Sequence, residues 1–160
     1  MTVWLVRHAH AGNRSAWSGD DAARPLSARG AAQASAIAAR LEHQPVTMVL
    51  SSPASRCVET VDGLAERRGV PVRAEPSLAE GADPDEALAC LLGAARSADG
   101  DLVACSHGDL IPAMVRRLSA TGMRAAMPDA VEKGSVWELE VHDGEVCRGI
   151  YHGAPSVDPV

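Results

Sequence analysis

The feature of this sequence that most constrains its fold is the alternation of short apolar runs with longer segments of helical pattern. Three runs are short, almost uncharged and typical of buried strands: 2–6, 46–50 and 101–105. Four further segments are expected to be helices: 27–43, 52–68, 83–97 and 109–121. Because strands that alternate with helices form mostly parallel sheets, this order predicts a three-layer α/β fold with helices on both faces of the sheet.

Local signals mark several element boundaries. Ser52-Pro53 is predicted to start a helix, with Ser52 as the N-cap and Pro53 as the first helical residue. Gly69 is predicted to end that helix. Near the C-terminus, Asp143-Gly144 separates two strand-like runs, so we expect a hairpin over 135–151.

Size and composition are those of one ordinary globular domain. The 160 residues, 46% apolar and 22% charged, can bury a hydrophobic core and do not resemble a disordered chain. A net charge of -6 and 2% aromatic residues predict no binding of nucleic acid or of an anionic membrane. No run approaches the length of a membrane span and no secretory signal is recognisable, so we expect a cytoplasmic protein.

The sequence predicts neither a metal nor a cofactor. Its cysteines are spread without a CxxC pair and are expected to be reduced and to fill the core: Cys57, Cys90, Cys105 and Cys147. His8 and His10 could share a strand face as a metal pair, but no carboxylate or cysteine supports them at a suitable spacing.

Polar motifs follow each of the three buried strands, at the sheet edge where α/β proteins bind ligands. They are Arg7-His8, the segment 51–56, and Ser106-His107-Gly108. Helical side chains lean toward the N-terminus of their helix, so Arg56 can reach back over the strand ends. Helix N-termini add free N–H groups. The sequence therefore predicts a cationic hollow, rich in hydrogen-bond donors, that suits a phosphate group.

Two histidines in such a hollow indicate chemistry beyond binding. A neutral imidazole is a nucleophile toward phosphorus, and its ordinary pKa of about 6.5 leaves it mostly unprotonated at pH 7. Neighbouring arginines lower that pKa and also stabilise charge on a transferring phosphoryl group. These residues predict a two-step route in which a phosphohistidine forms and water then hydrolyses it.

Three motifs together resemble those of the histidine phosphatase superfamily, which has the phosphoglycerate mutase-like fold: Leu5-Val-Arg-His-Ala9, Ser51-Ser-Pro-x-x-Arg56-x-x-Glu-Thr60 and Ser106-His-Gly108. They occur in the family's order, so the resemblance covers nearly the whole chain and implies a single histidine phosphatase domain over 1–160. It implies His8 as the nucleophile, and a phosphate pocket of three residues: Arg7, Arg56 and His107. It also implies Glu80 as a candidate acid for the leaving group. Ala9 stands where the family usually has glycine, a change from one small residue to another.

Two further stretches resemble a short bacterial branch of this family. Gly19-Asp-Asp21 and the segment 24–30 are similar to phosphohistidine phosphatases and to the phosphatase domain attached to some Nudix hydrolases. The segments 75–78 and 133–137 are closer to the latter. The stretch between Glu80 and His107 has room for one helix and no lid, so we expect an open site.

The leading hypothesis is a metal-independent phosphoric monoester hydrolase that acts on small phosphomonoesters, nucleotides among them. Glu80 motivates it, because an alkoxide is a poor leaving group that benefits from protonation. One alternative is a protein phosphohistidine phosphatase acting on a signalling or phosphotransfer domain. Another, of a different class, is a non-catalytic phosphate-binding regulatory module. A mutase is less favoured because the chain lacks lid material. The expected partner is thus a small phosphorylated substrate or a phosphorylated protein.

The loop from His8 to Pro25 holds further candidates for substrate contact. Asn13 and Arg14 can contact substrate or be solvated, and Trp17 can stack on a nucleobase or anchor the loop. Asp20 and Asp21 are expected in a solvated turn near the site.

Overall fold

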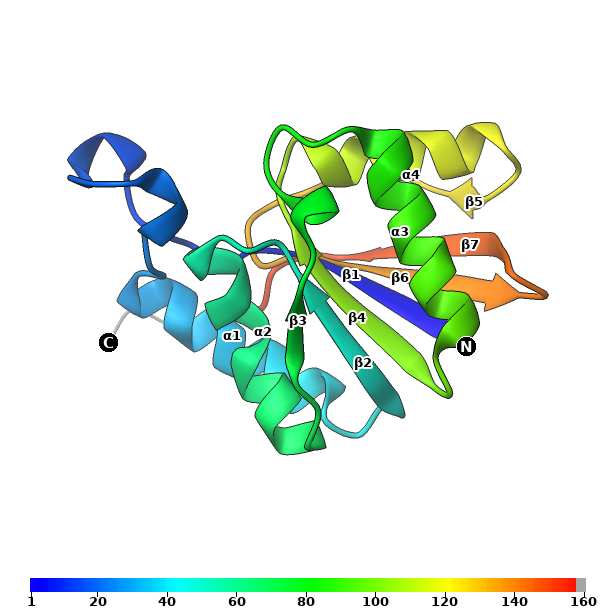
Figure 1. Cartoon of the computed structure of the whole chain (residues 1–160), viewed down its shortest axis with the longest axis horizontal. Helices are drawn as coiled ribbons and strands as arrows, with labels where there is room; N and C mark the ends of the chain where they lie inside the picture. The colour runs from blue at the N-terminus through cyan, green and yellow to red at the C-terminus, as the bar shows by residue number, and fades with distance from the viewer. Residues whose placement is uncertain (158–160) are drawn as a thin grey trace.

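The computed structural model describes residues 1–157 and has one central seven-stranded sheet (Figure 1). Its strands are β1 (Thr2–Arg7), β2 (Val46–Ser51), β3 (Val72–Ala74), β4 (Asp101–Ser106), β5 (Arg124–Ala125), β6 (Val136–His142) and β7 (Glu145–His152). Their order across the sheet is β3-β2-β4-β1-β6-β7-β5. Strands β3, β2, β4 and β1 are mutually parallel, whereas β6 is antiparallel to both β1 and β7.

Four α-helices in the described residues cover the two faces of this sheet (Figure 1). They are α1 (Ala28–Leu41), α2 (Ser55–Arg68), α3 (Pro84–Ser97) and α4 (Leu110–Ala120). Helices α1 and α2 pack on one face, and α3 and α4 on the other. The predicted three-layer α/β fold with a C-terminal hairpin is confirmed.

Alternate residues of each central strand face opposite helix layers. In β1, Leu5 packs with the α3 and α4 layer, whereas Val6 packs with α1 and α2. Both side chains are fully buried, because a sheet covered on both faces has no solvated side. Each such side chain contributes about 2 kcal/mol through burial. This two-sided burial explains why the strands appear in the sequence as continuous apolar runs.

Two local predictions have different outcomes. The hairpin between β6 and β7 is present, and Asp143 and Gly144 have φ angles of 50° and 78°, the positive values that a tight primed turn needs. The predicted start of α2 at Ser52-Pro53 is wrong, since the helix begins at Ser55 with Ala54 as its N-cap. The Ser52 hydroxyl instead lies 2.8 Å from a ring nitrogen of His107, which holds this residue outside the helix.

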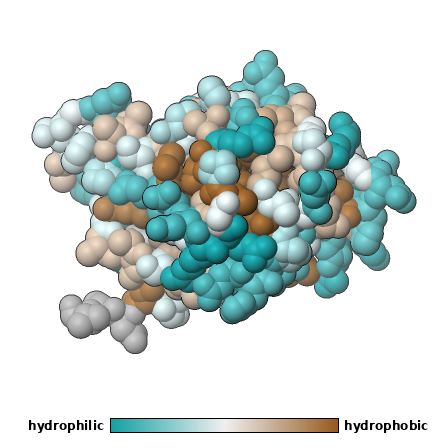
Figure 2. Space-filling view, turned by 60° about the horizontal axis from the view of Figure 1, so that its bottom comes forward, coloured by the Kyte–Doolittle hydropathy of each residue, from teal (hydrophilic) through white to brown (hydrophobic). Residues whose placement is uncertain are grey.

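The surface of the described residues has no large apolar face. Their exposed large hydrophobic side chains are scattered: Met1, Trp17 and Met127. On the face shown in Figure 2, the hydrophobic areas are small and hydrophilic residues separate them. A helix long and apolar enough to cross a membrane does not occur between residues 1 and 157.

Candidate active site

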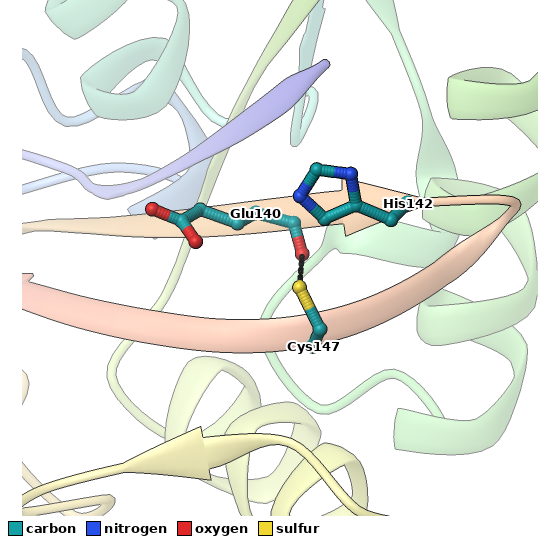
Figure 3. Close-up of side chains that lie close together, drawn as sticks. All are labelled: Glu140, His142 and Cys147. Carbon is teal, nitrogen blue, oxygen red and sulfur yellow. Dashed lines mark hydrogen bonds between the residues drawn. The ribbon is translucent and has the colours of Figure 1, made fainter.

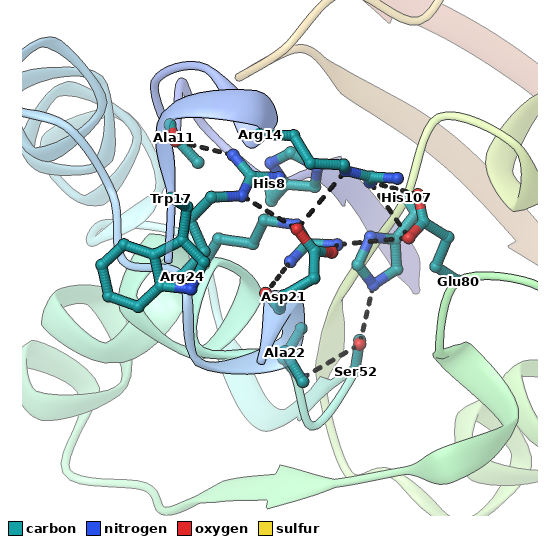
Figure 4. A network of polar contacts seen from close by, with 12 residues as sticks. His8, Ala11, Arg14, Trp17, Asp21, Ala22, Arg24, Ser52, Glu80 and His107 are labelled. Atoms are coloured by element: carbon teal, nitrogen blue, oxygen red, sulfur yellow. Dashed lines mark hydrogen bonds and ion pairs between the residues drawn. The ribbon is translucent and has the colours of Figure 1, made fainter. Parts of the chain in front are cut away.

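The predicted nucleophile and the three residues predicted to bind the phosphate come together where β1 and β4 end. Arg7 is the last residue of β1 and pairs with Ser106 of the parallel neighbour β4, so His8 and His107 follow at the same level. Their ring centroids lie 5.3 Å apart (Figure 4). Arg56 enters from the first turn of α2 and is 2% exposed. The sheet register thus brings together residues far apart in the sequence.

His8 is held as a neutral imidazole with one nitrogen free. Its Nδ1 lies 2.9 Å from the carbonyl oxygen of Ala9, and because a carbonyl only accepts, Nδ1 carries the proton. The lone pair of the neutral ring is therefore on Nε2. Burial, and then the charges of His107, Arg56 and Arg7, lower the pKa of His8 to about 3, although the bond to Ala9 opposes this shift. His8 is thus an unprotonated nucleophile at neutral pH.

The lowered pKa of His8 predicts a loss of stability in acid. The unfolded chain binds a proton at His8 below its ordinary pKa of 6.5, whereas the folded protein does not until about pH 3. Between pH 7 and pH 5 this difference should lower the free energy of unfolding by about 2 kcal/mol. Urea denaturation of the wild type and of His8→Ala at both pH values measures it. Equal pH dependence in the two proteins would contradict the assignment.

Three buried donors of this cluster have no protein partner. Within the described residues only four buried side-chain nitrogen or oxygen atoms lack a hydrogen bond, and three are Arg7 Nε, Arg56 Nε and His107 Nδ1. Unpaired buried polar atoms are rare because each costs about 1–3 kcal/mol. Their concentration beside His8 indicates a place where a bound group, such as an anion, completes the hydrogen bonding.

His107 is oriented by two residues that sequence reasoning did not assign to the site. Its Nε2 lies 2.8 Å from the Ser52 hydroxyl and 3.5 Å from the Cys57 thiol. Cys57 is fully buried, as expected of a core cysteine, and its thiol also contacts this ring at Nε2. The sequence signals Ser52 only through its place in the Ser51-to-Thr60 motif, where its type is equally typical of a helix N-cap.

Gly108 keeps the space that the Arg7 guanidinium occupies. A Cβ atom on Gly108 would lie 2.6 Å from Arg7 Cζ, so any larger residue displaces that group. We expect Gly108→Ala to lower kcat/KM about 100-fold through this misplacement, while the melting temperature changes little. Gly63→Ala is the matched control, because its added Cβ contacts nothing within 4 Å. Unchanged kinetics in Gly108→Ala would show that the position of Arg7 is not critical.

Asp21 was expected in a solvated turn, and the structure corrects that expectation. Its carboxylate forms ion pairs with three arginines: Arg24 at 3.0 Å, Arg14 at 3.3 Å and Arg56 at 3.3 Å (Figure 4). Desolvation by itself would raise the pKa of Asp21, but the hydrogen bond from Arg24 and the arginine charges lower it overall. The sequence does not predict the contact between Asp21 and Arg56, because it joins a loop to a helix that is distant in the sequence. Only the tertiary structure brings the two residues together.

Glu80 lies at the same site and is held as a carboxylate. Arg14 donates to its two oxygens at 3.0 and 3.2 Å, and Arg56 lies 3.4 Å from one of them. A guanidinium donates and does not accept, so a proton on these oxygens would have no acceptor there. These contacts favour a negatively charged Glu80 over a protonated acid.

The loop candidates have different locations. Arg14 lines a hollow of about 210 Å³ that opens onto His8, whereas Asn13 and Trp17 do not line it. Asn13 instead caps a short 3-10 turn by accepting hydrogen bonds from Ser15. Trp17 is 39% exposed and donates from its indole nitrogen to the carbonyl of Asp20 at 3.0 Å, which anchors the loop.

The structure separates the two histidines, His8 and His10, that could have formed a metal pair. His10 places its Nδ1 2.6 Å from the Ser27 hydroxyl, so it is engaged away from His8. The one group of three potential ligands in the described part of the chain is remote from His8, on the β6–β7 hairpin: Glu140, His142 and Cys147 (Figure 3). There the Cys147 thiol donates to the backbone carbonyl of Glu140 at 3.4 Å.

Comparisons with known proteins agree with the predicted family. A model of the histidine phosphatase superfamily (branch 1) matches residues 3–83. An 8-oxo-(d)GTP phosphatase of Mycolicibacterium smegmatis is 35% identical over 158 residues, which are 97% of this chain and 49% of that protein. The chain thus spans about half the length of this curated relative.

Solved structures share the fold. A putative phosphohistidine phosphatase SixA from Nakamurella multipartitia is 27% identical with a TM-score of 0.69, covering 86% of this chain and 83% of that one. The protein histidine phosphatase SixA complexed with tungstate has a TM-score of 0.77 at 20% identity, with 96% and 95% of the two chains covered. At 20% identity, the similarity to the tungstate complex shows a shared fold only.

Proposed function

Because the chain belongs to the histidine phosphatase superfamily, we propose that it is a phosphatase that carries the transferred phosphoryl group on His8, with residues 1–160 as one domain. The observation that supports this most is the neutral His8 ring, whose free Nε2 lies beside the unpartnered donors of Arg7, Arg56 and His107. A nucleophile next to unused donors is the arrangement that phosphoryl transfer requires.

In the first step, Nε2 of His8 attacks phosphorus and the bond from phosphorus to the leaving oxygen breaks. The electron pair of that bond stays with the leaving group. Arg7, Arg56 and His107 donate to the phosphoryl oxygens, whose charge they stabilise as the bonds change. Removing one such preorganised donor typically costs about 10²–10³ in rate.

In the second step, water attacks the phosphohistidine, the phosphorus–nitrogen bond breaks and His8 regains its lone pair. In this proposal Glu80, a carboxylate that lines the hollow, takes a proton from that water. The role of acid in the first step, which the sequence suggested, would require Glu80 to be protonated between two guanidinium groups. The contacts therefore favour substrates whose leaving group departs without a proton.

Leaving-group dependence tests this view of Glu80. Without a protonated acid, kcat/KM should fall steeply across a series of aryl phosphates as the pKa of the leaving phenol rises. Glu80→Gln should lower kcat, because Glu80 acts in the second step, and should keep the same slope of kcat/KM. A flat dependence in the wild type that becomes steep in Glu80→Gln would show instead that Glu80 protonates the leaving group.

The proposed substrates are small phosphorylated molecules, with nucleotides first, because the 35% identical relative is named for a nucleotide. A phosphohistidine on another protein is the second candidate. Its support is the name of the 27% identical structure and the good leaving ability of imidazole, which suits an ionised Glu80.

A side-by-side screen distinguishes the two candidates. Nucleoside phosphates and a phosphohistidine-bearing domain are incubated with the wild type and with His8→Ala, and released phosphate is measured. We expect the nucleotides to have the higher kcat/KM, with all release lost in His8→Ala. Fast turnover of the phosphohistidine domain with negligible nucleotide turnover would favour the second candidate.

A further inference from the structure

Lys133, the only lysine of the chain, lies at the hollow that contains His8. The backbone holds it there, because the N–H of the next residue, Gly134, lies 3.3 Å from the carbonyl of Arg7 and 3.2 Å from that of His8. The Arg7 guanidinium also donates to the carbonyl of Val131 at 2.7 Å on the same segment. The position of Lys133 is therefore tied to the backbone of the proposed nucleophile.

Within the described residues this ammonium group forms no ion pair, although two carboxylate residues, Glu80 and Asp109, line the same hollow as the arginines. The ion pairs of the site join Arg14, Arg24 and Arg56 to Asp21 and Glu80, and none includes Lys133. Partial burial, followed by the charges of four arginines, lowers the pKa of Lys133. A charged group in such surroundings is unfavourable unless an anion binds beside it. The phosphate donors next to His8 are separate atoms, on Arg7, Arg56 and His107.

We propose that Lys133 forms a second anion subsite, which binds a phosphate linked to the one that is transferred. This inference rests on the proposed function and deepens it: the substrates are diphosphates, or compounds with longer phosphate chains, and the terminal phosphoryl group goes to His8. In that reaction the bond from the terminal phosphorus to the bridging oxygen breaks. The leaving phosphate keeps the electron pair, and Lys133 pairs with its charge. Such a leaving group needs no acid, which agrees with Glu80 as a carboxylate.

Calorimetric binding of two non-hydrolysed ligands tests the subsite without turnover. Orthophosphate fills one subsite, whereas methylenediphosphonate carries two linked phosphoryl groups. We expect the wild type to bind the diphosphonate about tenfold or more tightly than orthophosphate, and Lys133→Met to lower that preference about tenfold, the effect of one hydrogen bond to a charged group. Lys133→Arg should keep most of it. Arg124→Met, on the remote edge strand β5, is the charge-matched control and should keep all of it.

Two results would overturn the subsite. One is equal affinity of the wild type for the two ligands, and the other is the same preference in Lys133→Met as in Arg124→Met. Circular dichroism of each variant verifies that it is folded. The proposed function can fail separately from the subsite. In that case no phosphate would be found on His8, whichever ligand the protein binds more tightly.

Discussion

Replacing His8 with alanine is expected to lower kcat/KM at least about 10⁴-fold while the protein stays folded. The other histidine of the site is not free to replace it as the nucleophile. The second ring, His107, has its Nε2 engaged by Ser52 and Cys57, which leaves Nδ1 to donate to the substrate. Steady-state phosphate release and thermal denaturation measure the two parts of this prediction.

The matched control for His8→Ala is His142→Ala, an exposed histidine on the β6–β7 hairpin, away from the hollow. It should keep full activity. If His8→Ala retained more than a few per cent of the wild-type kcat/KM, His8 would not be the nucleophile. Water or another side chain would then accept the phosphoryl group.

Arg56→Met should have the second largest effect, a loss of about 10²–10³ in kcat/KM. Arg56 is almost completely buried, and its Nε has no partner among residues 1–157, so its charge acts on the site with little solvent screening. Methionine keeps much of the length and apolar volume of the side chain. The substitution also leaves Asp21 and Glu80 without this guanidinium, which adds uncompensated negative charge where the substrate phosphate must bind.

Arg67→Met is the control for Arg56→Met. Arg67 is on the same helix, is exposed and pairs with Glu42 at 3.0 Å, far along α2 from the hollow. An exposed pair of this kind contributes at most about 1 kcal/mol, so activity should not change. Loss of less than tenfold in Arg56→Met would show that its charge is not used in phosphoryl transfer.

Most of the fold could be predicted because its strands are buried on both faces. A run such as 101–105 is buried at every position, so its mostly apolar composition identifies it as a strand. The two-residue strand β5 has no such signal, since it depends on its pairing with β7. The start of α2 was misplaced because Ser52 fits an N-cap locally. Its contact with His107, 55 residues further along the chain, is decided by tertiary structure.

The centre of the site could be predicted for a topological reason. Parallel neighbouring strands end at one edge, so residues that follow β1 and β4 must meet, and His8 and His107 do. The residues that reach the site through loops could not be predicted in this way. Asp21 reaches Arg56, and Lys133 reaches the hollow, through loops whose paths are set by contacts distant in sequence.

Trapping the phosphorylated protein tests the central claim most directly. A labelled substrate is mixed rapidly with the wild type and quenched in alkali, and the modified residue is located by mass spectrometry. We predict one phosphate on His8, bonded to Nε2, lost on brief treatment with acid and absent from His8→Ala. An acid-stable phosphate, or the same labelling in His8→Ala, would contradict the account.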